Sequence, residues 1–521
     1  MPSYTQKDPV RRPLDTMSLL VNALNQDPGR PLLHLLDGQT LNVGQVRDAT
    51  SRFVQALARI GVVEGTRVGL LSSNSPEVLH ASHAAKILGA IYIPMHPLGS
   101  LPDHLNTVRD AEVELLIFEG GRYDARAAEL AAEMPDVKLV ALGPTDLAED
   151  LCRLAASIPP RPLRPPMLDL AGIEQIGYSG GTTGKPKSLA ARRRTSAALM
   201  SIMLAEWDWP EPPRVLSCAP LSHAGGTMFL PTLLKNGTML VHPRFDPLAV
   251  LQAIQDYKIN CMMLVPTMIY ALLDHPRFGE FDLSSLETIF YGASLMSPVR
   301  LKEAIERIGP VFFQFYGQAE APMTVTVFRK SEHDTNSLER LSSCGRPVPW
   351  LLVELLDSEN HPVPDGQPGE ICVQGPIVMD GYRDNPELNA EVFSGGWLHT
   401  GDVAIRDHDG FLRIVDRKKD MIVSGGFNIY PRDIEDAMAL HPAVAQSAVI
   451  GVPHPQWGEA VKALVVLKPG QSASAEELIA LVAERKGRFQ APKSVEFIPE
   501  IPSTAVGKAD KKALRARYGS L

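Results

Sequence analysis

Two long stretches of the chain alternate short apolar runs with segments of helical periodicity, and this alternation most restricts the possible folds. In the first stretch, Arg67–Ser73 has the apolar content of a buried strand, and Ser75-Pro76-Glu77 begins a helix that extends to Gly89. The same alternation of strands and helices occurs again between residues 238 and 316. Strands that alternate with helices form parallel sheets covered on both faces. The sequence therefore predicts an α/β protein with layered, mostly parallel sheets.

The same periodicity gives the other elements of these two stretches. A segment with five prolines in nine residues, 158–166, is typical of a surface connection between them. Further strands are expected at 91–93, 115–118, 139–142, 238–241, 261–265, 287–291 and 311–316, and helices at 247–257, from 267 onward and at 298–308.

The helical periodicity of the sequence fades after about Leu341. From there to Val415, short strand-like runs alternate with Gly/Pro turns, which predicts a small antiparallel barrel or sheet. Beyond it, strands and helices mix again. We therefore expect a large N-terminal domain, residues 1–416, and a small mobile α+β C-terminal lid, residues 417–521. Residues from Lys418 onward carry 14 Lys and Arg against 11 Asp and Glu. This balance fits a lid over an anionic ligand, and equally an ordinary solvated surface.

Composition excludes several other classes of protein. A chain of 521 residues with 45% apolar and 21% charged residues is a multidomain globular protein, and its net charge of −9 gives no overall attraction to nucleic acid. The longest apolar stretch, Cys261–Leu273, is too short to span a bilayer as a helix. Residues 1–12 are polar and broken by prolines, without an apolar core of the length that a signal peptide needs. The five cysteines lack zinc or redox spacing. We expect a cytoplasmic protein without an integral membrane segment.

The segment Tyr178-Ser-Gly-Gly-Thr-Thr-Gly-Lys-Pro-Lys187 is the most informative part of the sequence. Its glycines permit turns that aim backbone N–H groups at one point, and its hydroxyl and lysine side chains add donors and positive charge. A polyphosphate needs such a cradle. An NTPase phosphate loop is the obvious alternative. It fails because Ser179 stands at the first glycine position and Pro186 follows Lys185.

Further segments follow in a fixed order and carry a resemblance to a known family. They are Pro220-Leu-Ser-His223, Tyr316-Gly-Gln-Ala-Glu320, Trp397-Leu-His-Thr-Gly-Asp402, Asp416-Arg-Lys-Lys-Asp420 with Ser424-Gly-Gly-Phe-Asn-Ile429, and Gly507-Lys508. With the phosphate loop, they resemble the adenylate-forming superfamily of acyl-CoA synthetases, peptide-synthetase adenylation domains and firefly luciferases. The resemblance covers essentially the whole chain.

The resemblance implies an AMP-forming acyl-CoA ligase. Such an enzyme converts a carboxylate and ATP to acyl-AMP and pyrophosphate with Mg²⁺, and CoA then displaces AMP. By this resemblance, the catalytic residues are Lys508, which joins the carboxylate to the α-phosphate, Glu320, which holds Mg²⁺, and His223, which separates the acyl pocket from the nucleotide. We do not expect His223 to be a general base.

The resemblance also assigns the binding residues. Asp402 binds the ribose hydroxyls, Arg417 the ribose or phosphates, and Tyr316 stacks on adenine. Lys419 is the hinge of the lid, Gly425 and Gly426 flank the CoA pantetheine, and Thr183 with Glu320 serves the metal. The expected ATP/AMP contacts are Ser179, Gly180, Gly181, Thr182, Thr183, Gly184, Lys187, Gly292, Ala293, Tyr316, Gly317, Asp402 and Arg417.

Several alternatives stay open on the sequence alone. An acyl-AMP ligase that delivers to a carrier protein shares every adenylation residue. Because the sequence ends about 13 residues after Lys508, we expect no fused carrier domain and free CoA as the simplest acceptor. A luciferase-like oxygenase and a non-catalytic binding module are the others. The sequence departs from the family motifs at three positions. Ala319 stands where the family usually has Thr before the Mg²⁺-linked Glu, and Ser188 stands where it usually has Gly after the phosphate loop. Tyr291 is bulkier than the residue often found before Gly-Ala. The oligomeric state is not determined, and a homodimer is an open alternative.

The acid itself is the least determined partner. The pocket candidates are small or apolar, and no Lys, Arg or Asp among them marks an amino acid or a dicarboxylate. We therefore expect a monocarboxylic acid with an apolar body, fatty or cyclic. These candidates are Gly225, Gly226, Ala319 and Met323.

Overall fold

The first half of the protein is organised around a seven-stranded sheet. The computed structural model describes residues 15–179, 187–417, 420–424, 427–455, 457–502 and 509–519. The sheet is parallel except for the antiparallel pairing of its last two strands. Its strands, in spatial order, are β7 (Glu149–Asp150), β6 (Lys138–Leu142), β5 (Leu115–Glu119), β3 (Arg67–Leu71), β4 (Ile91–Pro94), β8 (Ile173–Ser179) and β9 (Lys187–Arg192).

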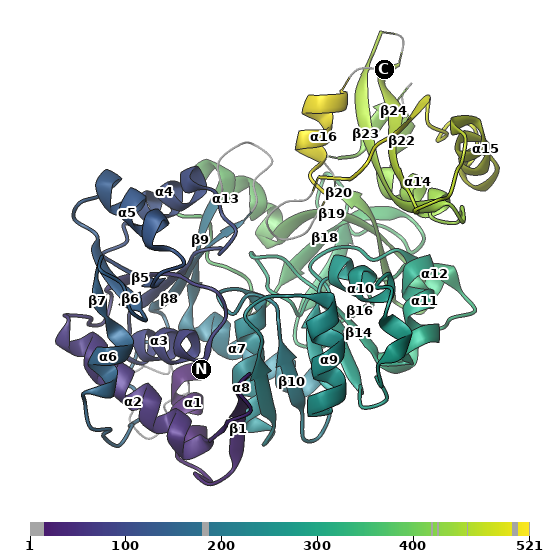
Figure 1. Cartoon of the computed structure of the whole chain (residues 1–521). Helices are drawn as coiled ribbons and strands as arrows, with labels where there is room; N and C mark the ends of the chain where they lie inside the picture. The colour runs from purple at the N-terminus through teal and green to yellow at the C-terminus, as the bar shows by residue number, and fades with distance from the viewer. Residues whose placement is uncertain are drawn as a thin grey trace.

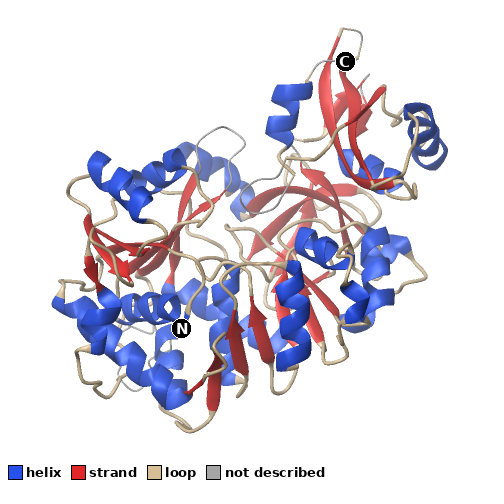
Figure 2. Ribbon diagram, viewed as in Figure 1, coloured by secondary structure: helices blue, strands red, loops and turns tan. Residues whose placement is uncertain are grey.

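Helices cover both faces of this sheet (Figures 1 and 2). One face packs on α4 (Leu101–Asp110) and α5 (Asp124–Glu133), which share an apolar cluster with β3, β4 and β5. The other face packs on α2 (Val43–Arg59), α3 (Pro76–Ile87) and α6 (Leu151–Ala156). The predicted parallel layer with helices on both sides is confirmed.

A nine-stranded sheet forms the second layer. Its five central pairings are parallel, and its outer pairings are antiparallel. Its strands, in spatial order, are β16 (Arg346–Pro347), β15 (Thr326–Phe328), β14 (Phe312–Tyr316), β13 (Thr288–Tyr291), β12 (Cys261–Leu264), β10 (Arg214–Ser217), β11 (Thr238–Val241), β1 (Pro31–His34) and β2 (Thr40–Asn42).

The largest apolar cluster of the protein lies between the two sheets. It includes residues from α1 (Thr16–Leu24), α2, α3, α7 (Arg193–Glu206) and α8 (Phe229–Leu234). The opposite face of the nine-stranded sheet packs on α9 (Pro247–Tyr257), α10 (Pro266–Leu273), α11 (Pro298–Ile308) and α12 (Leu338–Leu341). Burial against one shared core therefore fixes how the two sheets face each other.

Local signals explain why the helices begin where they do. Pro76, Pro247 and Pro298 each occupy the first turn of a helix, where the missing N–H costs no hydrogen bond. Asp246 caps α9 by accepting a hydrogen bond from the Ala249 N–H at 2.9 Å. The expected helices at 247–257 and 298–308 are confirmed residue for residue.

The remaining strands form two smaller sheets. The predicted barrel or sheet after Leu341 is an antiparallel four-stranded sheet of β17 (Leu352–Leu356), β18 (Pro368–Gln374), β19 (Leu398–Arg406) and β20 (Leu412–Arg417), flanked by α13 (Pro386–Val392). The last sheet contains β22 (Phe427–Ile429), β21 (Ile422–Ser424), β24 (Gly458–Leu467), β23 (Val444–His454) and β25 (Ser494–Phe497). It packs with α14 (Pro431–Met438), α15 (Ala475–Lys486) and α16 (Lys511–Tyr518) above the rest of the molecule in Figure 1.

No helix in these described parts of the chain is long and apolar enough to cross a membrane.

Candidate active site

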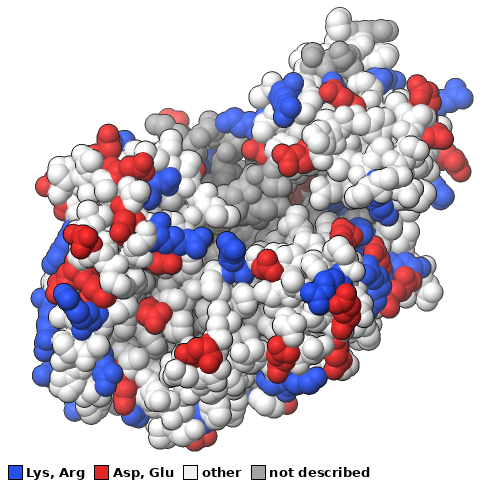
Figure 3. All heavy atoms as spheres, viewed as in Figure 1, with Lys and Arg blue, Asp and Glu red and all other residues white. Residues whose placement is uncertain are grey.

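One large cavity of about 1740 Å³ opens where the sheets meet. Its wall includes residues of β8 and β9, of the loops after β13 and β14, of β19 and of the C-terminal α14 and α16. Figure 3 shows the surface hollowed below the C-terminal part of the chain, with acidic and basic side chains intermixed over this face. The carboxyl ends of parallel strands commonly bear ligand sites in such sheets, and β13 and β14 end here.

Asp402 and Tyr316 meet on the wall of this cavity although 86 residues separate them. The Tyr316 hydroxyl donates to Asp402 Oδ2 at 2.7 Å, and Gln318 Nε2 donates to the same oxygen. Asp402 is 5% exposed. Burial and the nearby Asp402 carboxylate raise the pKa of Tyr316 well above its ordinary value, so the phenol keeps the proton that it donates. Asp402 Oδ2 is thus held in one orientation by two donors.

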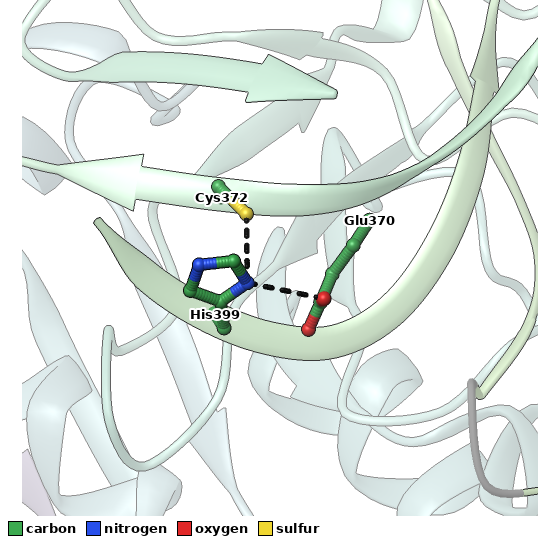
Figure 4. A group of neighbouring side chains, drawn as sticks. All are labelled: Glu370, Cys372 and His399. Carbon is green, nitrogen blue, oxygen red and sulfur yellow. Dashed lines mark hydrogen bonds and ion pairs between the residues drawn. The ribbon is translucent and has the colours of Figure 1, made fainter. Parts of the chain in front are cut away.

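Strand β19 turns locally just before Asp402, where its register with β18 shifts and Gly401 has a φ of 72°. Figure 4 shows Glu370 and Cys372 of β18 beside His399 of β19. Glu370 Oε1 accepts a hydrogen bond from the Gly401 N–H at 2.8 Å, and Glu370 Oε2 lies 3.1 Å from His399 Nδ1. His399 Nε2 donates to the Ser394 carbonyl at 3.2 Å. Cys372 Sγ lies 3.4 Å from His399 Nδ1. Glu370, Cys372 and His399 offer donor atoms within 4.8 Å of one another, but their hydrogen bonds already engage both carboxylate oxygens and both ring nitrogens. A role in positioning the turn accounts for this arrangement.

Glu320 joins two of the predicted motifs. Its carboxylate is buried, and Oε1 accepts a hydrogen bond from the Tyr382 hydroxyl at 2.6 Å. The Lys187 ammonium lies 5.2 Å from the centre of the Tyr382 ring, within range of a cation–π contact. Lys187, Tyr382 and Glu320 all line the cavity. The end of the phosphate loop and the Tyr-Gly-Gln-Ala-Glu motif are therefore neighbours.

His223 lies on the cavity wall just before the short 3₁₀ helix η1 (Ala224–Met228). Its Nδ1 is 2.8 Å from the Ser222 hydroxyl, and its ring lies edge-on to His96 with centroids 4.9 Å apart. The ring is exposed to the cavity, and the surrounding cavity walls, with His96 second, lower the pKa of His223 to about 4. A neutral imidazole fits the predicted role as a partition.

Two glycine positions are required by close backbone contacts. A Cβ at Gly292 would lie 2.4 Å from the Phe315 carbonyl oxygen, and one at Gly226 would lie 2.2 Å from the Leu221 carbonyl oxygen. Ala293 follows with a φ of 66° and lines the cavity. The interpretation that the glycines at 225 and 226 leave room for an acyl chain is therefore incomplete, because tight packing of η1 on the preceding loop demands Gly226 in any case.

Charged residues of the C-terminal part of the chain close one side of the cavity. Arg432 Nη2 donates to the Met296 carbonyl at 2.8 Å across to the loop before α11, and its guanidinium pairs with Asp436 at 2.7 Å. Burial raises the pKa of Asp436 to about 6, against the opposing effect of Arg432. Lys511 pairs with Glu435 at 3.1 Å. Positive groups thus face the cavity from this side, with acidic partners beside them.

The structure brings together seven of the predicted site residues. Gly292, although not on the wall itself, lies next to one of them. Two predicted residues are described only in their backbone, namely Ser179 and Arg417. The other predicted residues that lie outside the described parts of the chain are Gly180, Gly181, Thr182, Thr183, Gly184, Lys419, Gly425, Gly426 and Lys508. The residues that line one cavity are Lys187, His223, Ala293, Tyr316, Gly317, Glu320 and Asp402.

Other residues of the site were not predicted. Gln318 and Glu370 act on Asp402 or its turn, and their signal was available, because Gln318 lies inside a recognised motif and Glu370 begins a strand-like run. His83 and Lys86 also line the cavity, together with Glu174. Their signal was the spacing of three residues between His83 and Lys86, which puts both side chains on one face of the expected helix.

Comparisons with known proteins decide the family. Residues 20–383 match the AMP-binding enzyme family, and residues 433–508 match the AMP-binding enzyme C-terminal domain. The chain belongs to the AMP-binding enzyme family. A medium/long-chain-fatty-acid–CoA ligase of Mycobacterium tuberculosis is 46% identical over 523 residues, which cover 98% of this chain and 91% of the relative. A feruloyl-CoA synthase of an Amycolatopsis species is 36% identical over 92% of this chain and 95% of the relative.

Solved structures agree with this assignment. The amide bond synthetase McbA from Marinactinospora thermotolerans superimposes with a TM-score of 0.87 at 32% identity, over 96% of this chain and 100% of that one. The resemblance and the reaction class that the motifs indicated are confirmed. The AMP-binding enzyme is an AMP-forming acid–thiol ligase that activates a carboxylic acid with ATP and transfers it to CoA.

Proposed function

We propose that the acid substrate is a monocarboxylic acid with a predominantly apolar body. The observation that carries the proposal is the apolar part of the cavity wall. It is lined by Leu79 of α3, Leu199 and Met200 of α7, and Leu230 of α8. Burying an apolar chain against such a surface contributes about 0.8 kcal/mol per methylene group. The names of the two ligases above, which act on fatty and feruloyl groups, support the same class.

We propose that the described site residues bind ATP in the first half-reaction, the formation of acyl-AMP. Asp402 accepts hydrogen bonds from the ribose hydroxyls, and Tyr316 stacks on adenine while its hydroxyl orients Asp402. Attack of the acid on the α-phosphate gathers negative charge, which fixed donors and cations must stabilise. Lys187 lies on the cavity wall as one such cation, and Lys508 is the expected second one.

The donor set near Glu320 fits a magnesium ion. Mg²⁺ prefers one or two carboxylates completed by water and phosphate oxygens. Glu320 offers a buried carboxylate, one oxygen of which Tyr382 orients. With Thr183, Glu320 would hold the ion, whose charge would neutralise the phosphates of ATP.

The two-domain division belongs to the same proposal. Residues 1–416 would form the body that binds the acid and ATP, and residues 417–521 the lid that rotates about Lys419 between the two half-reactions. Gly425 and Gly426 would then flank the pantetheine of CoA. The cytoplasmic location and the homodimer stay predictions, which cell fractionation and sedimentation analysis would test.

The decisive experiment incubates purified protein with ATP, Mg²⁺, CoA and a panel of fatty, branched, aromatic and cyclic acids, and detects products by mass spectrometry. We expect one CoA thioester per turnover together with one AMP. Formation of AMP or acyl-AMP without any thioester would contradict CoA as the acceptor, and formation of thioesters only from dicarboxylic or amino acids would contradict the proposed substrate class.

The same assay separates the half-reactions. Lys508→Ala is expected to raise the activation barrier to acyl-AMP formation by about 3–4 kcal/mol, as the loss of one charge-stabilising donor does. Thioester formation from chemically prepared acyl-AMP should be affected much less. Equal losses in both half-reactions would contradict the assigned role of Lys508.

A further inference from the structure

A histidine and an ion pair lie beside the apolar residues of the inner wall of the cavity. His83 and Lys86 lie on α3, and Glu174 lies on β8, and we name them the distal polar cluster. Lys86 Nζ lies 3.3 Å from Glu174 Oε1, with the two side chains 19% and 7% exposed. The Lys86 ammonium also lies 5.0 Å from the centre of the Tyr92 ring. The fold thus places an ion pair inside the cavity, where removing the two charges from water costs free energy.

The hydrogen-bonding capacity of this cluster is not used up. Glu174 Oε2 is buried and has no hydrogen-bond partner among the described residues, and the same holds for the hydroxyl of Thr16, which lines the same cavity. His83 makes no hydrogen bond within the described part of the chain, and its ring packs on Phe229 with centroids 5.0 Å apart. Buried carboxylate oxygens almost always have a partner. The arrangement therefore points to a partner that a ligand supplies.

The cluster lies far from the nucleotide. Strand β8 begins next to Glu174 and ends at Ser179, where the phosphate loop starts. Five residues of extended chain span ~17 Å. The cluster therefore lies about 17 Å along β8 from the start of the phosphate loop, where the nucleotide is proposed to bind.

We infer that the distal polar cluster binds a hydroxyl group at the far end of the acyl substrate. This inference rests on the proposed function. A hydroxyl group donates one hydrogen bond, which Glu174 Oε2 accepts, and it accepts one, which Lys86 or His83 donates. Burial, with Lys86 and His80 adding to it, lowers the pKa of His83 to about 3, so the ring faces the cavity neutral.

The chemistry of the cluster disfavours charged ends. Lys86 and Glu174 already neutralise each other, so a distal carboxylate or ammonium would add an uncompensated charge in a poorly solvated space. A terminal methyl group would leave Glu174 Oε2 without a partner. A hydroxyl satisfies the donor and the acceptor at once without adding charge.

The test compares acids that differ only at their far end. Purified wild-type enzyme is assayed for CoA thioester with straight-chain acids of eight to sixteen carbons that end in a methyl, hydroxyl, carboxylate or ammonium group. At the best length, we expect the hydroxy acid to exceed the methyl-terminated acid at least tenfold in kcat/KM, because a site that hydrogen-bonds a hydroxyl strongly rejects the analogue without it. The charged acids should be poorer than both.

A double variant links the preference to the cluster. Lys86→Met with Glu174→Met replaces the buried pair by apolar side chains of similar size, a change that proteins often tolerate. It should abolish or reverse the preference for the hydroxy acid while methyl-terminated acids still react. The matched control is Lys235→Met with Glu211→Met, which removes an ion pair of 3.1 Å that does not line the cavity. This control should keep the wild-type preference.

The outcomes separate this inference from the function on which it rests. Methyl-terminated acids that react as well as or better than hydroxy acids in the wild type would overturn the inference and leave the ligase intact. So would a preference that survives the double variant, since water alone would then account for the free oxygen of Glu174. No thioester from any of these acids would count against the proposed substrate class and against the inference with it.

Discussion

Removing the Tyr316 hydroxyl tests whether Asp402 is held in place for the ribose. Tyr316→Phe keeps the aromatic ring that is proposed to stack on adenine and deletes only the group that donates to Asp402 Oδ2 at 2.7 Å. Gln318 still donates to the same oxygen, so Asp402 keeps one partner. The variant therefore separates orientation of the carboxylate from stacking on the base.

The size of the effect follows from the type of hydrogen bond lost. A hydrogen bond to a charged group contributes about 1.5–3 kcal/mol, and the remaining bond from Gln318 puts the expected loss at the lower end. A loss of about 1.5 kcal/mol corresponds to a roughly tenfold lower kcat/KM for ATP. The assay is ATP–pyrophosphate exchange at saturating acid, which measures the first half-reaction without CoA. The KM for CoA in the complete reaction should not change.

Another buried tyrosine provides the control. The Tyr291 hydroxyl donates to Gln314 Oε1 at 3.0 Å on the adjacent strand of the same sheet, and Tyr291 does not line the cavity. Tyr291→Phe should lower the melting temperature without raising the KM for ATP. If Tyr316→Phe keeps an ATP kcat/KM within twofold of the wild type, or if Tyr291→Phe loses as much, the reasoning about Asp402 is wrong.

Three further predictions concern the same molecule. Glu370→Gln should raise the KM for ATP about tenfold, because the turn before Asp402 loses a charge-assisted hydrogen bond. Glu354→Gln, on a half-buried carboxylate of the same sheet that pairs with Arg406, should not raise it, and equal KM values for the two variants in steady-state assays would contradict this. Glu320→Gln should raise the Mg²⁺ concentration for half-maximal rate, measured by metal titration, and an unchanged titration would remove Glu320 from the metal site. Burial lowers the pKa of His80 to about 4, below that of the unfolded chain, so the unfolded state binds more protons and stability falls as the pH drops from about 6.5 to 4. His80→Gln should recover about 2 kcal/mol of that loss between pH 7 and pH 5 in denaturant titrations, and an unchanged slope would refute the assignment.

Much of the fold could be read from local signals. Pro76, Pro247 and Pro298 each begin a helix, and the apolar runs between the helices are the buried strands of two parallel layers. These signals are local because a strand buried on both faces must be apolar along its length, and a proline fits only the first turn of a helix. The sequence did not give the order of strands, which places β1 beside β11 across some 200 residues of chain, because pairing partners leave no local mark.

The site divides in the same way. The order of the motifs and their resemblance to a known family were sufficient to predict that one reaction uses Lys187, His223, Tyr316, Glu320 and Asp402. The contacts among them were not readable.

The sequence by itself determined the α/β class, the family and the reaction, through helix starts, apolar runs and six ordered motifs that are each local in the chain. Only the tertiary structure decided that Glu370 supports the turn of Asp402, that Tyr382 orients Glu320, and that Lys86 and Glu174 form an ion pair on the cavity wall. These pairs are 31, 62 and 88 residues apart. Their proximity depends on which strands pair and which helix packs against them, and that is decided by burial of the whole core rather than by any segment alone.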